Sequence, residues 1–226
     1  MNVLVTGGMG YIGSHTVVEL LNAGDNVIVV DNLVNSKIEV KEKIETITGK
    51  TFKCYEEDLI NLNEVYRIFR ENKIDSVIHF AALKAVSESV SKPLEYYENN
   101  LISTLNVLRA MKQYNVKNFV FSSSATVYGE AKTMPILEDF ELSATNPYGR
   151  SKLIIEDVLR DLYNADKNFN IAILRYFNPV GAHESGLIGE NPNGIPNNLM
   201  PYITQVAIGK LSKLNVFGND YNTKDG

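Results

Sequence analysis

The sequence is poor in the features that mark several classes of protein. It holds a single cysteine, Cys54, among 226 residues, so an intramolecular disulfide is excluded. A chain without disulfides is typical of a reducing compartment, and we expect a cytoplasmic protein. Cys54 lies in an apolar segment, where a thiol is usually a small packed side chain rather than a reactive group.

An excess of positive charge is also absent. Lysine and arginine total 22 against 27 for aspartate and glutamate, which gives a formal net charge of −5. Since no basic cluster interrupts this balance, the sequence predicts no nucleic-acid partner and no anionic membrane surface. No apolar run approaches the length of a membrane-spanning helix. Hydrophobic residues still make up 44% of the chain, which is typical of a soluble globular protein.

Short apolar runs rich in β-branched residues alternate with helix-length segments as far as Arg175. This alternation predicts an α/β fold, a doubly wound parallel sheet of the Rossmann type with helices on both faces. Ligands of such sheets bind beyond the carboxyl ends of the strands. The expected strands are Val3–Val5, Val27–Val30, Thr51–Tyr55, Val77–Phe80, Phe119–Phe121 and Ile171–Leu174. The expected helices are Tyr11–Ala23, Ile38–Thr46, Leu62–Glu71, Leu94–Tyr114 and Tyr148–Ala165.

The pattern changes after Arg175. Residues 176–196 are rich in glycine and proline, and a helix near Leu199–Gly209 and a short strand at Leu214–Phe217 are expected to follow. We therefore divide the chain into a dinucleotide-binding domain, residues 1–175, and a smaller substrate-binding region, residues 176–226. A turn-rich stretch directly after a strand is an unusual place for a domain to end, so we expect this region to be incomplete.

A glycine-rich loop joins the first expected strand to the first helix. It contains Gly7, Gly10 and Gly13, which allow a tight turn and a close approach of a pyrophosphate to the backbone. The helix N-terminus adds free N–H groups and a positive dipole end. Asp31 ends the second strand, where a carboxylate accepts hydrogen bonds from the adenosine ribose and repels a 2′-phosphate. The sequence therefore predicts NAD binding, with NAD preferred over NADP.

Tyr148 and Lys152 stand four residues apart, which places both side chains on one face of a helix. Tyrosine is a poor base at neutral pH because its pKa is about 10. A lysine ammonium at ~4 Å, with an effective dielectric constant of ~20, favours the phenolate by about 4 kcal/mol. We therefore expect Lys152 to lower the pKa of Tyr148, which then takes a proton from a substrate hydroxyl. Ser122, Ser123 and Ser124 end the preceding strand, and their hydroxyls either hold the reacting oxygen or cap the turn.

Segments spread over the whole chain together resemble the UDP-glucose 4-epimerase family of the extended short-chain dehydrogenase/reductase superfamily. The glycine loop and the Tyr-x-x-x-Lys pair are common to the superfamily, whereas the last two segments of the set are closer to the epimerases. The segments are Gly7–His15, Asp31–Leu33, Phe80–Val86, Pro93–Tyr97, Ser122–Gly129, Tyr148–Lys152, Tyr176–His183 and Ile195–Leu199.

The resemblance implies a set of site residues. Tyr148 is the expected base and acid, Lys152 its activator and Ser124 the hydroxyl partner. The residues expected to bind NAD are Gly7, Gly10, Tyr11, Ile12, Gly13, Asp31, Asn32, Asp58, Leu59, Phe80, Ala81, Lys84, Asn99, Tyr148, Lys152 and Tyr176. The residues expected to bind UDP-glucose or UDP-galactose are Ser124, Tyr148, Asn178, Asn198, Leu199 and Phe217.

The resemblance also implies an isomerase reaction. Hydride leaves C4 of the sugar, the 4-keto sugar turns over, and hydride returns to the other face, so NAD is regenerated in each cycle. Chains of the family continue well past Gly226, in a part that carries arginines for the diphosphate. We therefore expect a C-terminally truncated chain that binds NAD, binds UDP-sugars weakly and epimerises little by itself.

Two further points stay open at this stage. The apolar positions Leu101, Leu105 and Leu108, with the helical segment Leu153–Leu162, form either a homodimer interface, as in the family, or core that faces the sheet. The histidines His15, His79 and His183 lie too far apart in the sequence for a local metal signature, so no metal is expected.

The sequence bears differently on three rival functions. A nucleotide-sugar 4,6-dehydratase needs an acid pair after the strand-end hydroxyl, and Ala125-Thr126 supplies none. A catalytically silent NAD-binding protein is expected to lose Tyr148 or Lys152, and both are present. An inactive NAD-binding fragment is the third alternative.

Overall fold

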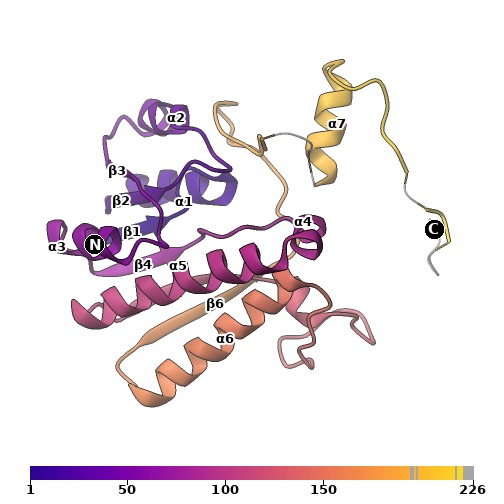
Figure 1. The fold of residues 1–226 in the computed structure, drawn as a ribbon. Coiled ribbons are helices and arrows are strands. Elements are labelled where there is room, and N and C mark those ends of the chain that lie inside the picture. Colours follow the sequence, from indigo (N-terminus) through magenta and orange to yellow (C-terminus); the bar gives the residue numbers. More distant parts are fainter. Residues whose placement is uncertain (194–195, 197, 217, 221–226) are drawn as a thin grey trace. The chain divides into compact units, whose positions relative to one another are not determined.

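The computed structural model describes residues 1–193, 196, 198–216 and 218–220. It divides into two compact units, Met1–Gly189 and Glu190–Gly226. The first unit contains a six-stranded parallel sheet with the strand order β3-β2-β1-β4-β5-β6 (Figure 1). The strands are β1 (Asn2–Thr6), β2 (Asn26–Asp31), β3 (Lys53–Glu56), β4 (Ser76–His79), β5 (Asn118–Ser124) and β6 (Asn170–Tyr176). The predicted doubly wound sheet is confirmed.

The helices cover both faces of this sheet, because the inner strands β1 and β2 are apolar on both sides. On β1, Val3 and Val5 pack into a core with α1 (Tyr11–Asn22) and α2 (Glu39–Thr48). Leu4 faces the opposite core. The helices of that second core are α3 (Leu62–Glu71), α5 (Pro93–Gln113) and α6 (Pro147–Ala165). The strand order reverses between β1 and β4, and this switch point is where a doubly wound sheet binds its ligand.

Two short elements were not expected from the sequence. The helix α4 (Val86–Ser91) and the 3₁₀-helix η1 (Ala125–Tyr128) follow β4 and β5 respectively. Neither is long enough to show a helical period of apolar residues, which is the signal that reveals the longer helices. η1 follows β5 directly, whereas α4 begins after residues 80–85, which contain predicted cofactor residues.

One expected strand is wrong. In the described part of Leu214–Phe217, residues 214–216 have no regular secondary structure, and Phe217 lies outside the described residues. The Val216 side chain is 83% exposed, so its apolar character does not reflect burial in a sheet. A strand needs a partner for its backbone N–H and C=O groups. The second unit does contain the expected helix, α7 (Leu199–Ala207).

No helix in the described part of the chain combines the length and the apolar character needed to cross a lipid bilayer.

Candidate functional site

The glycine loop leaves no room for side chains at two of its glycines. Gly7 has a φ of +67°, a left-handed conformation that side chains disfavour. A Cβ atom at Gly13 would overlap the Gly7 carbonyl oxygen and lie 2.8 Å from the Gly8 Cα. The loop is held by a hydrogen bond of 2.8 Å from the Gly7 N–H to the Val30 carbonyl. The N-terminus of α1 thus starts from bare backbone, a form that fits a bound pyrophosphate.

Asp31 ties this loop to the turn that follows β2. Its Oδ2 accepts a hydrogen bond of 3.0 Å from the Met9 N–H, and its Oδ1 accepts bonds from the Leu33 N–H (2.9 Å) and the Ser36 hydroxyl (2.7 Å). Asp31 therefore has a structural role in addition to its predicted contact with the ribose. Two carboxylate oxygens offer about four acceptor sites, so further acceptor capacity remains for a ligand hydroxyl.

The carboxyl ends of β2 and β3 are joined by predicted cofactor residues. Asn32 donates a hydrogen bond of 3.1 Å from its Nδ2 to the Asp58 Oδ2. Leu59 is buried, and its carbonyl accepts a 2.9 Å bond from the buried Asn106 side chain on α5. The structure thus brings Asn32, Asp58 and Leu59 to one corner of the sheet, although they are far apart in the sequence.

The segment after β4 contains the predicted cofactor residues Phe80, Ala81 and Lys84. The Phe80 ring lies 6.5 Å from the Tyr176 ring at the end of β6, measured between centroids. Asn100 on α5 fixes the segment, because its side chain accepts a 2.8 Å bond from the Leu83 N–H and donates a 3.1 Å bond to the Leu83 carbonyl. The neighbouring Asn99, also predicted to bind the cofactor, donates a 3.0 Å bond to the Asn100 side chain.

Asn100 also joins this segment to α6, the helix that carries the catalytic pair. Its Nδ2 donates a 3.1 Å bond to the Ser151 hydroxyl, which in turn donates a 2.7 Å bond to the Tyr148 carbonyl. No sequence pattern marks Asn100, because Leu83 and Ser151, which its side chain binds, lie in two other segments of the chain.

Lys152 reaches from α6 to the end of β5. Its ammonium group donates a 2.8 Å hydrogen bond to the Ser122 carbonyl and lies 4.9 Å from the centre of the Phe121 ring. The same nitrogen lies 5.9 Å from the centre of the Tyr148 ring. The predicted proximity of Tyr148 and Lys152 on one face of α6 is therefore seen in the structure.

Ser124 is the serine at the end of β5 whose hydroxyl can still donate a hydrogen bond to a ligand or to Tyr148. Its Oγ accepts hydrogen bonds from the Thr126 N–H (3.2 Å) and the Thr126 hydroxyl (2.9 Å), so both acceptor positions are used. Its own hydrogen is then available for donation. A hydrogen bond with Ser124 acts to lower the pKa of Tyr148. The Ser123 hydroxyl is instead bound to Glu156.

The pKa shifts of Tyr148 and Lys152 differ from those expected from the sequence. Burial raises the pKa of Tyr148 and outweighs the hydrogen bond from Ser124 that lowers it. Burial also lowers the pKa of Lys152 from 10.5 to about 7. Lys152 is therefore only partly charged at neutral pH, and in the protein alone it does not depress the pKa of Tyr148 as we expected. The expected effect of Lys152 assumed a charged ammonium in surroundings of intermediate polarity. The folded chain removes this group from water, which disfavours its charged form.

This burial predicts a pH-dependent effect of Lys152→Met on stability. Between about pH 7 and pH 10.5 the unfolded chain binds a proton that folded Lys152 has lost, so stability of the parent rises with pH. Below pH 7 the folded parent must bury the charge, and Lys152→Met removes that cost. We expect the variant to be more stable by roughly 1–2 kcal/mol at pH 6, with the gain disappearing near pH 10.

Urea unfolding of parent and Lys152→Met at both pH values measures this difference. A variant that is less stable than the parent by the same amount at pH 6 and pH 10 would show that the buried ammonium is fully charged and well satisfied.

Both ring nitrogens of His79 are bound to threonine hydroxyls. Its Nδ1 and Nε2 lie 2.7 Å and 3.0 Å from the hydroxyls of Thr6 and Thr104. Since the Thr104 hydroxyl donates to the Asn100 carbonyl, we infer that Nε2 carries the hydrogen and Nδ1 accepts from Thr6. Burial, with the charge of Lys152, lowers the pKa of His79 to about 3, so the ring is neutral.

The predicted sugar-binding residues are divided between the two compact units. Ser124, Tyr148 and the exposed Asn178 belong to the first unit. Asn198 and Leu199 begin α7 in the second unit, where the Asn198 side chain donates a hydrogen bond to Glu190. Phe217, the remaining member of the predicted set, lies outside the described residues.

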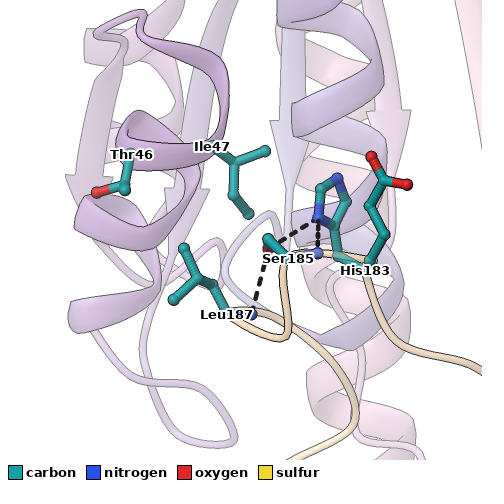
Figure 2. A pocket seen from close by; sticks show the side chains of 6 residues that line it. Thr46, Ile47, His183, Ser185 and Leu187 are labelled. Atoms are coloured by element: carbon teal, nitrogen blue, oxygen red, sulfur yellow. Dashed lines mark hydrogen bonds between the residues drawn. The ribbon is translucent and has the colours of Figure 1, made fainter.

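A hollow of about 590 Å³ lies between α2 and the segment after β6 (Figure 2). It is lined by Thr46, Ile47, His183, Glu184, Ser185 and Leu187. In Figure 2 the His183 ring faces Ser185, whose N–H donates a 3.2 Å bond to the His183 Nδ1. None of the lining residues belongs to the predicted site, so we do not assign the hollow to it.

The sheet, the glycine loop and the Ser124–Tyr148–Lys152 group define a Rossmann protein of the short-chain dehydrogenase/reductase type. The family model described as GDP-mannose 4,6 dehydratase matches residues 4–226. UDP-glucose 4-epimerases of Bacillus subtilis (strain 168) and Haemophilus influenzae are 62% and 63% identical to the whole chain. The chain belongs to this family and, within it, to the UDP-glucose 4-epimerases.

Solved structures agree with this assignment. The UDP-glucose 4-epimerase from Bifidobacterium longum, in complex with NAD+ and UDP, matches the whole chain with a TM-score of 0.97 and 57% identity. The enzyme from Stenotrophomonas maltophila, with bound NAD and formylated UDP-arabinopyranose, matches with a TM-score of 0.96 and 50% identity. The chain spans 67% of the length of the two curated relatives and 68% and 67% of the two solved chains.

Proposed function

We propose that this chain acts as an NAD-dependent UDP-glucose 4-epimerase, which interconverts UDP-galactose and UDP-glucose through a 4-keto sugar. The observation that carries the proposal is the meeting of Ser124, Tyr148 and Lys152 at the end of β5, in a sheet whose first loop is shaped for a pyrophosphate. The high identity to epimerases over the whole chain supports the same reaction.

The cofactor is held by residues at the carboxyl ends of the strands. Gly7, Gly10 and Gly13 receive the pyrophosphate, and Asp31 binds the ribose hydroxyls beside the Asn32–Asp58 corner. Bound NAD supplies the acceptor and donor of hydride. In this proposal residues 1–175 form the cofactor domain, and residues 176–226 begin the region that binds the UDP-sugar.

Tyr148 is proposed to accept the proton of the sugar 4-hydroxyl and to return it after the sugar turns over. Ser124 donates a hydrogen bond to the reacting oxygen, because Thr126 already fills its acceptor positions. Lys152 holds the end of β5 through the Ser122 carbonyl and contributes positive charge near the phenol. A positively charged nicotinamide beside Tyr148 would favour the phenolate and so oppose the effect of burial.

The dehydratase alternative is disfavoured by the residues after Ser124. Removal of a 6-hydroxyl requires a proton donor next to the strand-end hydroxyl. Here that place is taken by Ala125, which packs in a small apolar cluster, and by Thr126, whose hydroxyl donates to Ser124. Neither supplies an acidic group.

Incubation of the chain with UDP-galactose tests the proposal. We expect UDP-glucose to appear, at a low rate for this chain by itself, without added NAD in the assay, provided that the protein has been loaded with NAD and freed of excess. A 4-keto-6-deoxy product would instead identify a dehydratase. Tight NAD binding with no product from any UDP-sugar would identify a silent binding protein.

Cofactor choice gives a separate prediction. The Asp31 carboxylate should repel a 2′-phosphate, so we expect NAD to bind at least about tenfold more tightly than NADP, or about 1.4 kcal/mol. Asp31→Ala should abolish the preference. It should also weaken both affinities, because the Met9 and Leu33 N–H groups lose their acceptor. Ser36→Ala, which leaves the carboxylate in place, serves as the control. Equal affinity of the parent for NAD and NADP would refute the role of Asp31.

We further propose a homodimer formed through the exposed face of α5. The predicted apolar positions are divided in the structure, because Leu101, Leu108 and, on α6, Leu159 pack in the core, whereas Leu105 is 36% exposed. Leu94, on the same helix as Leu105, is 78% exposed. Exposed apolar side chains on one helix are typical of association surfaces. We expect Leu105→Glu to shift the chain from dimer to monomer in analytical ultracentrifugation, while Leu108→Glu should unfold it. A parent that sediments as a monomer would contradict this proposal.

A further inference from the structure

Three successive turns of α6 face three consecutive residues at the end of β5. Lys152 binds the Ser122 carbonyl, and the Ser124 hydroxyl is near enough to Tyr148 to lower its pKa. The next residue at the same spacing is Glu156, whose carboxylate accepts a 2.5 Å bond from the Ser123 hydroxyl. Glu156 belongs to none of the sequence motifs, although its place one turn after Lys152 puts it on the same helix face.

Glu156 is a fully buried carboxylate with four donors. Besides Ser123, it receives bonds of 3.0 Å and 2.8 Å from the Nε and Nη2 of Arg175, and one of 2.7 Å from Arg160. Arg175 therefore binds it in a two-pronged geometry. Burial acts to raise the pKa of Glu156, but the hydrogen bonds from Arg175 and Ser123 outweigh it, so the pKa lies below its ordinary value. The carboxylate is ionised at neutral pH.

Arg175 extends the contact to the segments around the site. Its Nη1 donates bonds of 2.8 Å to the Tyr128 hydroxyl and 3.0 Å to the Glu138 carbonyl. Its guanidinium lies 4.8 Å from the centre of the Tyr128 ring. Tyr128 ends η1, the 3₁₀-helix that contains Thr126 and follows Ser124 directly.

The register of the sheet puts this pair next to the candidate site. Ser123 and Arg175 are opposite each other on β5 and β6, and the following pair is Ser124 and Tyr176. Glu156 therefore binds β5 and β6 at the residues just before Ser124 and Tyr176, the predicted site residues of these strands. No other residue in the described part of the chain is recorded as binding the Ser123 hydroxyl.

Building on the proposed epimerase function, we infer that Glu156 and Arg175 form a positioning pair that sets Ser124 against Tyr148. Glu156 on α6 and Arg175 on β6 together hold the end of β5. Arg175 also holds η1 through the Tyr128 hydroxyl. Stability alone is a weak reason for such a pair, because buried ion pairs are often replaced by apolar residues at no cost in folding free energy. The fixed geometry of the pair is useful beside a reaction site, because a displacement of the reacting groups by about 1 Å slows a reaction by on the order of 100-fold.

Arg175→Met tests the inference, with Arg160→Met as the matched control. Both variants remove an arginine from the same carboxylate, but among the described residues Arg160 hydrogen-bonds to Glu156 and Asp157 of its own helix, not to β5, β6 or η1. We expect Arg175→Met to lower kcat by roughly 10–100-fold, with the KM for UDP-galactose and the Kd for NAD changed by less than about threefold. Arg160→Met should keep kcat within about twofold of the parent.

Conservative variants separate positioning from a general loss of fold. Arg175→Lys retains the charge but lacks the planar guanidinium group. It should therefore melt at the temperature of the parent, while its kcat stays below about a third of the parental value. If Arg175→Met does not fold, the double variant Glu156→Leu with Arg175→Met removes the uncompensated charge. That protein should fold and show the same low kcat.

Hydrogen exchange of the chain without substrate gives a readout that does not depend on turnover. Amides of residues 122–129 should exchange at least about tenfold faster in Arg175→Met than in Arg160→Met. Equal exchange in the two variants, or equal kcat where the parent is active, overturns the positioning role. A parent that binds no NAD and converts no UDP-sugar overturns the proposed function instead, and the exchange comparison still decides whether the pair holds the end of β5.

Discussion

Tyr148→Phe is expected to lower the rate of epimerisation roughly 10²–10⁴-fold, the usual effect of removing a positioned proton-transfer group. The ring itself should stay in place, since Phe retains the contact with Lys152 at the end of β5. We therefore expect NAD affinity and melting temperature to stay close to those of the parent. Steady-state assays of UDP-galactose conversion, with calorimetric titration of NAD, measure both quantities.

Tyr163→Phe is a suitable control for this variant. Tyr163 lies on the same helix, is largely exposed, and contacts Lys167 rather than any predicted site residue. It should leave turnover unchanged. Turnover of Tyr148→Phe within about threefold of the parent would show that another group transfers the proton.

Gly13→Ala is expected to have the second largest effect, a loss of NAD binding by more than about 100-fold. The added methyl group would overlap the Gly7 carbonyl and press on Gly8, both backbone groups that no rotamer change can move. The loop must then shift away from the N-terminus of α1, where the pyrophosphate is proposed to bind. Overpacking of this kind costs typically 1–3 kcal/mol, so the melting temperature should fall as well.

Gly10→Ala provides a graded comparison at the same loop. Its Cβ would lie 3.3 Å from the Gly7 carbonyl, a tight contact that a small movement relieves. We expect a melting temperature near that of the parent for Gly10→Ala and a clear decrease for Gly13→Ala. If both variants melt like the parent and Gly13→Ala binds NAD normally, the loop is not the close-packed phosphate site described above.

The sheet and its loops were largely predictable from the sequence because the signals are local. Buried parallel strands such as β1 and β2 are continuous apolar runs, and the glycine loop lies between the first strand and its helix. The spacing of Tyr148 and Lys152 likewise fixes a shared helix face before any tertiary structure is known. These features depend on residues that are close in the chain.

The rest depends on contacts between distant segments. Glu156 and Asn100 gain their roles from Ser123, Arg175 and Leu83, which only the folded sheet brings near them. The depressed pKa of Lys152 follows from burial, which spacing alone does not reveal. The expected strand at Leu214–Phe217 was wrong in its described part because an apolar run without a neighbouring strand has no partner for its backbone.

The fate of the hydrogen on C4 of the sugar tests the central proposal most directly. The chain, loaded with NAD, is given UDP-galactose that carries deuterium at C4, in ordinary water, and the UDP-glucose formed is analysed by mass spectrometry. Because a hydrogen that is transferred as hydride stays bound to carbon and does not exchange with water, we predict that the product retains the deuterium at C4. Loss of the deuterium to water would contradict the proposed epimerase reaction.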